Sequence, residues 1–345
     1  MMLIEKIILS EERNVSLTAY IQEVGGEFSY IDKRPAILIL PGGGYQFCSD
    51  REAEPVALAY LKAGFQAFVL RYSVGVHAAW PQPLNDYEQA MAMIRANSEK
   101  WLLDPERVAV IGFSAGGHLA GCAAAMAENK PNAVILGYAV VYGEDAVKCN
   151  PTAPDVVAAV DRNTAPSFIF ASRRDNVVPI RNSTLYANAC AVNDVAFESH
   201  IYAYGPHGFS LADSSLQDPA VEMCVRISDW VEDSIAWLKE TMGDYTAEGL
   251  SDPAYRLHMT DDGENYYSAD CSLLYLFSQE EAKKIVTPVL DMIGQAFAGG
   301  AKISIEDLSA VLGDLTLRDM LGQMHIPASR IKELDEKLRE LQKEV

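Results

Sequence analysis

Residues 107–116 read RVAVIGFSAG, an apolar run that ends in the pattern Gly-x-Ser-x-Gly. Arg107 to Phe113 predicts a buried strand, and the small residues from Ala115 to Ala127 predict a helix directly after it. This pattern between a strand and a helix is typical of a sharp turn that holds a serine in a strained, exposed conformation. Ser114 is therefore a candidate nucleophile. The alternative is a small-residue turn that lets the helix pack closely on the strand.

Strands and helices alternate on both sides of this turn. Apolar runs predict further strands at 36–40, 67–72, 133–141, 167–171 and 197–202. Helical spacing and composition predict helices at 52–63, 84–101, 180–193 and 220–241. Continuous apolar strands that alternate with helices indicate a mostly parallel sheet covered by helices on both faces. The predicted fold class is therefore α/β, over residues 1–243.

The alternation stops near residue 243, where glycine, proline and charged residues replace it as far as Pro253. We therefore expect a second, smaller and mainly helical domain over 244–345, whose role the sequence does not indicate. It should contain a turn at 261–263 and helices at 279–297, 304–312 and 328–343. The last helix spaces four apolar residues as a short heptad seam, which packs onto its own domain or forms a dimer contact: Ile331, Leu334, Leu338 and Leu341.

Composition narrows the classes of function. The chain has 28 Lys and Arg against 48 Asp and Glu, a net charge of −20, which disfavours nucleic-acid binding. No apolar run reaches the roughly 18 residues of a membrane span. The first ten residues lack a basic region and a cleavage site, so we expect no secretory signal and a cytoplasmic location. No two of the six cysteines form Cys-x-x-Cys, so we expect neither a zinc site nor a redox pair. Because we expect no export signal, we expect all six thiols to be reduced.

A serine hydroxyl needs a base, and the base needs an acid to orient it. His207 lies in Tyr-Gly-Pro-His-Gly-Phe (204–209), in the loop after the last predicted strand, and is the candidate base. Asp175 follows strand 167–171 and completes the chain order Ser, Asp, His. The alternative for Asp175 is an N-cap or turn aspartate for the helix at 180–193. His118, one helical turn after Ser114, is expected to be structural.

Negative charge on a reacting carbonyl oxygen also needs hydrogen-bond donors. The backbone N–H of Ala115 is one candidate, because it begins the helix after the serine. The glycine run after strand 36–40 supplies Gly43 and Gly44, where missing side chains let amides approach a substrate. The alternative for this run is a plain flexible turn.

Together these motifs resemble the α/β-hydrolase superfamily over residues 15–241. Five segments are similar to its esterase and lipase group: PGGGY (41–45), SDRE (49–52), LRY (70–72), GFSAGGH (112–118) and DNVVP (175–179). That group includes acetyl-xylan esterase-like carbohydrate esterases, hormone-sensitive-lipase-like esterases and kynurenine formamidases. The resemblance implies Ser114 as nucleophile, Asp175 and His207 as its partners, and Gly43, Gly44 and Ala115 as oxyanion donors. Pro41 stands where the family's His-Gly-Gly-Gly loop begins with histidine, and residues 245–345 fall outside the resemblance.

The expected activity is serine ester hydrolysis through an acyl-enzyme, with no metal or organic cofactor. About 25 residues separate the strands at 133–141 and 167–171, which is too short for a large lipase lid. A short ester is therefore favoured, with acetyl groups on a sugar or oligosaccharide as the substrate. Tyr45, Arg51 and Tyr72 are candidates for lining its pocket.

Two other functions are left open by the sequence. The same triad serves amide, formamide or peptide hydrolysis, and a non-catalytic scaffold could keep the fold. We expect neither a nucleic-acid nor a membrane partner; a homo-oligomer through the C-terminal segment is an option.

Overall fold

The computed structural model describes residues 2–255, 257–258, 266–297 and 315–343. The chain divides into two compact units, residues 1–255 (unit 1) and 256–345 (unit 2). The turn expected at 261–263 and the helix expected at 304–312 lie outside the described residues. Among the described residues, no helix combines the length and the apolar character that crossing a bilayer requires.

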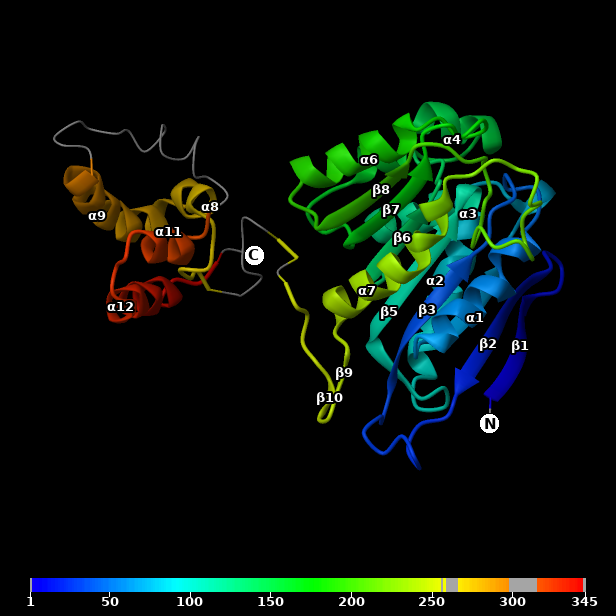
Figure 1. Cartoon of the computed structure of the whole chain (residues 1–345), viewed down its shortest axis with the longest axis horizontal. Helices are drawn as coiled ribbons and strands as arrows, with labels where there is room; N and C mark the ends of the chain where they lie inside the picture. The colour runs from blue at the N-terminus through cyan, green and yellow to red at the C-terminus, as the bar shows by residue number, and fades with distance from the viewer. Residues whose placement is uncertain (1, 256, 259–265, 298–314, 344–345) are drawn as a thin grey trace. The chain divides into compact units, whose positions relative to one another are not determined.

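Unit 1 is built on one eight-stranded sheet (Figure 1) with the strand order β1-β2-β4-β3-β5-β6-β7-β8. Strand β2 pairs antiparallel with β1 and β4, and every later pair is parallel. The predicted α/β class with a mostly parallel sheet is therefore confirmed. The strands are β1 (Met2–Ser10), β2 (Val15–Gln22), β3 (Arg34–Leu40), β4 (Gln66–Arg71), β5 (Leu103–Phe113), β6 (Ala133–Gly137), β7 (Ser167–Ser172) and β8 (Phe197–Tyr202).

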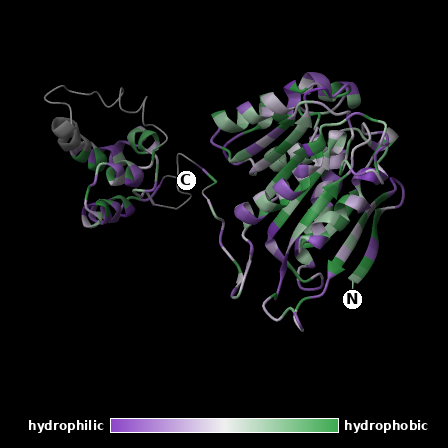
Figure 2. Cartoon of the chain, viewed as in Figure 1, coloured by the Kyte–Doolittle hydropathy of each residue, from purple (hydrophilic) through white to green (hydrophobic). Residues whose placement is uncertain are grey.

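The central strands of the sheet are buried on both faces because each contains a continuous apolar stretch, such as residues 36–40 of β3. In β3, Leu38 enters the hydrophobic cluster shared with α2, α3 and α6, whereas Ile37 and Ile39 enter the one shared with α1 and α7. Figure 2 shows apolar residues concentrated along the strands. The helices of unit 1 are α1 (Glu54–Lys62), α2 (Gln82–Ala96), α3 (Ser114–Met126), α4 (Gly143–Cys149), α5 (Val156–Ala159), α6 (Arg181–Val192) and α7 (Trp230–Met242).

The structure departs from several of the sequence-based elements. Strands β1 and β2 were not predicted. Strand β1 is an edge strand with exposed residues and a weak apolar signal. Strand β2 is buried, but Ser16 and Thr18 interrupt its apolar residues. Strand β6 ends at Gly137 because Tyr138 turns the chain with φ 36°. The helix expected from residue 220 begins at Trp230, because the N–H of Cys224 donates to the carbonyl of Tyr204 and holds this segment as a loop.

The end of unit 1 lies later than the boundary expected at 243/244. A hairpin of β9 (Tyr245–Thr246) and β10 (Gly249–Leu250) follows α7. The Tyr245 hydroxyl donates to the carbonyl of Gly64 at 2.7 Å, and Arg107 donates to the carbonyl of Ser251 at 2.8 Å. These bonds attach the hairpin to unit 1, and the division of the chain falls after Tyr255.

Unit 2 is helical where it is described and has its own hydrophobic core. Its helices are α8 (Leu273–Ser278), α9 (Glu280–Phe297), α11 (Leu317–Gln323) and α12 (Ala328–Arg339). Ile331, Leu334 and Leu338 of the predicted seam are buried in this core, so they pack within their own unit.

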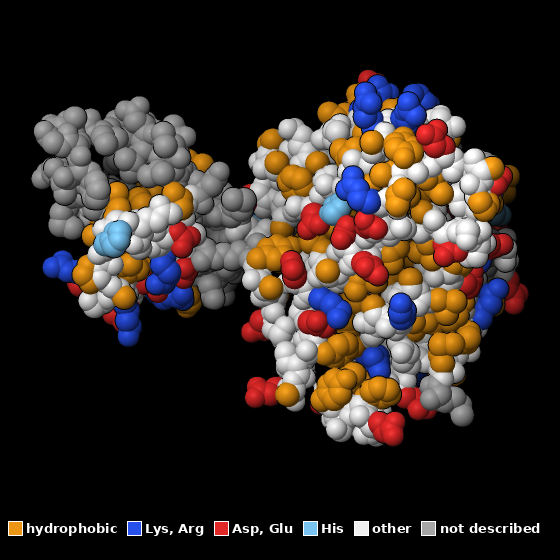
Figure 3. All heavy atoms as spheres, in the orientation of Figure 1, with side chains coloured by type: hydrophobic (Ala, Val, Ile, Leu, Met, Phe, Trp, Pro, Cys, Tyr) orange, Lys and Arg blue, Asp and Glu red, His pale blue; other side chains and the backbone are white. Residues whose placement is uncertain are grey.

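Figure 3 shows the charged side chains on one face of the molecule. On the face seen in Figure 3, basic side chains lie interspersed with acidic ones and with apolar patches.

Candidate active site

The turn at Ser114 has the strained geometry expected from the sequence. Ser114 begins α3 directly after β5 with φ 52°, a left-handed conformation that non-glycine residues rarely adopt. A Cβ at Gly116 would lie 2.1 Å from the carbonyl oxygen of Leu40 and 2.4 Å from that of Pro41. Only glycine at 116 therefore lets α3 approach the end of β3.

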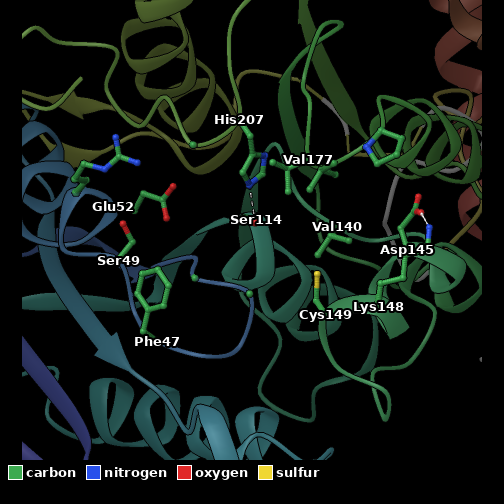
Figure 4. Close-up of a pocket in the computed structure, with 16 residues that line it drawn as sticks. Phe47, Ser49, Glu52, Ser114, Val140, Asp145, Lys148, Cys149, Val177 and His207 are labelled. Atoms are coloured by element: carbon green, nitrogen blue, oxygen red, sulfur yellow. Dashed lines mark hydrogen bonds and ion pairs between the residues drawn. The ribbon is translucent and has the colours of Figure 1, made fainter. Parts of the chain in front are cut away.

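His207 and Asp175 reach Ser114 from the ends of two other strands. His207 lies in the loop after β8, and its Nε2 is 2.9 Å from Ser114 Oγ (Figure 4). Its Nδ1 is 2.7 Å from Asp175 Oδ2, in the loop after β7. Because a carboxylate only accepts, Nδ1 carries the ring proton and Nε2 is free to accept from the serine hydroxyl.

Asp175 is held in place by its own loop. Its Oδ1 accepts hydrogen bonds from the backbone N–H groups of Val177 and Val178, both at 2.8 Å, and its side chain is 1% exposed. It does not cap the following helix, because α6 has Ile180 at its N-cap and no side-chain cap. The carboxylate is therefore fixed toward His207.

The glycine loop after β3 forms another wall of the site. Gly43 has φ +133°, and a Cβ there would lie 2.1 Å from the carbonyl oxygen of Phe47, so this position requires glycine. Gly43 and Gly44 line the same cavity as Ser114. Ala115 is fully buried and is not a cavity-lining residue, but its N–H belongs to the first turn of α3, where backbone donors lack helical acceptors.

The cavity has a volume of about 350 Å³. In Figure 4, Phe47 and Ser49 lie on one side of Ser114, and Val140 and Cys149 on the other. The residues that line it are Gly43, Gly44, Phe47, Ser49, Arg51, Glu52, Ser114, Val140, Asp145, Lys148, Cys149, Val177, Val178, Pro179, His207 and Gly208.

Of the three expected pocket residues, the structure places only Arg51 at the cavity. Its guanidinium donates to Gln217 Oε1 at 2.8 Å. Tyr45 and Tyr72 are each 1% exposed and lie inside the core. The Tyr72 hydroxyl donates to the carbonyl of Pro41 at 2.7 Å, behind the glycine loop, so this phenol supports the wall of the cavity from behind.

His118 is a buried structural histidine in the structure. Its Nε2–H donates to the carbonyl of Pro154 at 2.9 Å, so Nδ1 is the acceptor for the Tyr45 hydroxyl at 2.7 Å. Burial lowers the pKa of His118 to about 4, so the ring is neutral at neutral pH.

Glu52 is a site residue that the sequence reasoning missed. It lies at the end of the short 3-10 helix Asp50–Glu52, lines the cavity and is 4% exposed. Its carboxylate accepts from the N–H of Gly42 at 2.8 Å and from the Tyr138 hydroxyl at 2.6 Å. Burial raises the pKa of Glu52. One feature of the sequence could have pointed to Glu52: it is an acidic residue beside Ala53 and Val56, which belong to the buried apolar side of α1.

Comparison with known proteins finds a family model and solved structures that are similar to this chain. The family described as BD-FAE matches residues 29–134. The crystal structure of MGS-M1, an α/β hydrolase from a Medee basin deep-sea metagenome library, is 41% identical with a TM-score of 0.63, covering 70% of this chain and 98% of that one. An acetyl ester-xyloside bifunctional hydrolase from Caldicellulosiruptor lactoaceticus is 29% identical with a TM-score of 0.58, covering 66% and 88%.

Two curated relatives each match about half of the chain. Endo-1,4-beta-xylanase B of Butyrivibrio fibrisolvens is 33% identical over 211 residues, 52% of this chain and 33% of that protein. The acetylxylan esterase of Xylanibacter ruminicola is 30% identical over 211 residues, 53% of this chain and 44% of that protein. The chain thus spans less than half the length of these two relatives.

The fold and the matched structures define the class: the chain belongs to the α/β-hydrolase superfamily. Within it, the chain is similar to the acetyl-xylan esterase-like group of esterases. The resemblance seen in the sequence motifs is therefore confirmed.

Proposed function

We propose that this chain is a serine carboxylesterase that removes short acyl groups, acetyl above all, from sugars or oligosaccharides. The observation that carries the proposal is the line of hydrogen bonds from Ser114 Oγ to His207 Nε2 at 2.9 Å and from His207 Nδ1 to Asp175 Oδ2 at 2.7 Å. The similarity to an acetylxylan esterase supports an acetyl ester as substrate. The cavity of about 350 Å³ supports a small acyl group.

In the proposed first step, Ser114 Oγ attacks the ester carbonyl while its proton moves to His207 Nε2. Asp175 keeps the ring proton on Nδ1 and stabilises the imidazolium that forms. The tetrahedral intermediate collapses when the C–O bond to the alcohol breaks, and the Nε2 proton goes to the departing oxygen. The products of this step are the free alcohol and an acyl group on Ser114.

In the proposed second step, His207 takes a proton from water, and the resulting hydroxide attacks the acyl carbon. The bond to Ser114 Oγ then breaks, the serine regains its proton, and the carboxylic acid leaves.

In both steps the carbonyl oxygen becomes negative. We assign its stabilisation to the N–H of Ala115 and to the amides of Gly43 and Gly44, because both glycines border the cavity beside Ser114. All these groups belong to the protein, so the proposed reaction uses no metal or organic cofactor.

Purified full-length chain assayed with p-nitrophenyl acetate and acetylated xylo-oligosaccharides tests this proposal, with matched butyryl, feruloyl and formamide substrates. We expect release of acetate with a preference for acetyl over butyryl, and slower cleavage of the formamide. Absence of hydrolysis of every ester, or faster cleavage of the formamide, would overturn the ester assignment. Ser114→Ala is the control for contaminating hydrolase.

Three further expectations stay predictions. They are a cytoplasmic location, the absence of nucleic-acid and membrane partners, and a homo-oligomer through residues 244–345. Fractionation of cells that produce the protein tests the first, and light scattering of the full chain tests the last.

A further inference from the structure

The carboxylate of Glu52 joins two loops of the site that are far apart in the sequence. Its Oε2 accepts from the N–H of Gly42, which starts the glycine loop, at 2.8 Å. Its Oε1 accepts from the hydroxyl of Tyr138, which follows β6, at 2.6 Å. Each carboxylate oxygen therefore has one donor.

Tyr138 carries this connection to the histidine loop. Its hydroxyl oxygen accepts from the N–H of Ser210 at 3.1 Å, three residues after His207. Its ring lies edge-on to the His207 ring, with centroids 5.1 Å apart. The Ser210 hydroxyl donates to the carbonyl of Arg51, the residue before Glu52, at 2.6 Å. We call this closed set of hydrogen bonds among Glu52, Tyr138, Ser210 and Arg51 the circuit.

From this circuit we infer that Glu52 is a positioning residue for the reaction under the proposed function, on which the inference rests. It holds the glycine loop through Gly42 and the His207 ring through Tyr138. The oxyanion donors and His207 therefore keep fixed distances from Ser114. Glu52 lies on the same side of the cavity as Ser49 (Figure 4). Its two donors, Gly42 and Tyr138, are buried and do not line the cavity.

The chemistry of the two donors makes a carboxylate hard to replace. Glutamine offers one acceptor oxygen and one NH₂ donor in the same shape. If its oxygen faces the fixed N–H of Gly42, its NH₂ faces Tyr138, whose oxygen already accepts from Ser210. The Tyr138 hydroxyl proton then loses its acceptor, and the side of the circuit that carries His207 must shift.

Glu52→Gln in the full chain tests this inference. We expect kcat for p-nitrophenyl acetate to fall about 10- to 100-fold, because displacements of about 1 Å in a catalytic constellation have this effect. We expect KM to change less than about twofold, since the substrate cavity keeps its shape. The rate at which a fluorophosphonate labels Ser114 should fall by a similar factor, and this readout does not depend on the natural ester.

Two further variants make the test specific. Tyr138→Phe should also lower the labelling rate, by a smaller factor than Glu52→Gln. This variant still tests the inference if Glu52→Gln does not fold. Glu54→Gln is the matched control: Glu54 is two residues away, pairs with Arg71 at 3.1 Å and does not line the cavity. It should leave kcat and labelling unchanged.

The outcomes separate the two proposals. Wild-type kcat and labelling in both Glu52→Gln and Tyr138→Phe would overturn the role of Glu52 and leave the esterase proposal intact. Labelling of the wild type without hydrolysis of any ester would overturn the substrate, while the labelling rate still measures the effect of Glu52. A wild type that is not labelled at all would overturn both.

Discussion

The hydroxyl of Tyr45 donates to Nδ1 of His118 at 2.7 Å, while Nε2–H on the other side of the ring donates to the carbonyl of Pro154 at 2.9 Å. Each ring nitrogen of the neutral imidazole therefore has a hydrogen-bond partner. A second proton on Nδ1 would require the Tyr45 hydroxyl to turn its own proton away and accept instead. The fully buried ring also lacks water to solvate a charge, and burial lowers its pKa to about 4.

This contact predicts that unit 1 loses stability in acid. The unfolded chain binds a proton at His118 near its ordinary pKa of about 6.5, whereas the folded chain binds it only near 4. The contribution of His118 to the free energy of unfolding is therefore fully present above pH 6.5. It falls by about 3 kcal/mol as the pH drops from 6.5 through 4. Urea unfolding at pH 7, 5.5 and 4.5 measures it by tryptophan fluorescence, because Trp80, Trp101, Trp230 and Trp237 all lie in unit 1.

His118→Gln is the informative variant, since glutamine can accept from Tyr45 and donate to Pro154 without titrating. It should flatten the acid loss, whereas substitution of the exposed His325 in unit 2 should not. Parallel pH curves for His118→Gln and the wild type would show that His118 is not the source.

Substitution of Ser114 should separate activity from stability. Ser114→Ala should abolish fluorophosphonate labelling and reduce ester hydrolysis by on the order of 10⁴-fold, because no other hydroxyl faces His207 Nε2 among the described contacts. Ser114→Gly should be equally inactive but about 1 kcal/mol more stable than Ser114→Ala, since glycine accepts φ 52° without strain. Equal stability of the two variants would argue against strain at this turn.

Gly116→Ala should destabilise unit 1 by at least about 3 kcal/mol, because its Cβ would lie 2.1 Å and 2.4 Å from backbone oxygens that cannot move independently. Gly121, in the same helix, offers a matched comparison: a Cβ there would lie 2.8 Å from a methyl of Val156, which can rotate. The urea midpoint should be highest for the wild type, lower for Gly121→Ala and lowest for Gly116→Ala. The reverse order of the two variants would contradict the packing argument.

Tyr72→Phe should lower both stability and activity. Loss of the 2.7 Å bond to the carbonyl of Pro41 leaves a buried acceptor unpaired, which costs about 1–2 kcal/mol. It also frees the glycine loop, so kcat should fall about tenfold.

Tyr87→Phe is the control for Tyr72→Phe, since its hydroxyl donates to the carbonyl of Asn129 at 2.8 Å away from the cavity. It should lose similar stability with unchanged kcat. If both variants kept wild-type kcat, Tyr72 would have no role in holding the loop.

The sequence predicted the elements whose signals are local. The alternation of strands and helices from residue 36 to 202 matches β3 to β8. The central strands β3 to β7 each contain a continuous apolar run, whereas β8 is an edge strand with mostly exposed residues. The edge strand β1 escaped because an edge strand half open to solvent loses that run. The short helices α4 and α5 were not predicted because they have too few residues to show a helical period.

What the sequence determined by itself was the strained turn at Ser114 and the chain order Ser114, Asp175, His207. A turn depends on adjacent residues, and parallel strands bring their carboxyl-end loops to one edge of the sheet whatever the loops contain. What only the tertiary structure decided was the direction of the side chains between those loops. Tyr45 and Tyr72 point into the core and Glu52 borders the cavity, because each orientation is set by a donor or acceptor contributed by a distant segment.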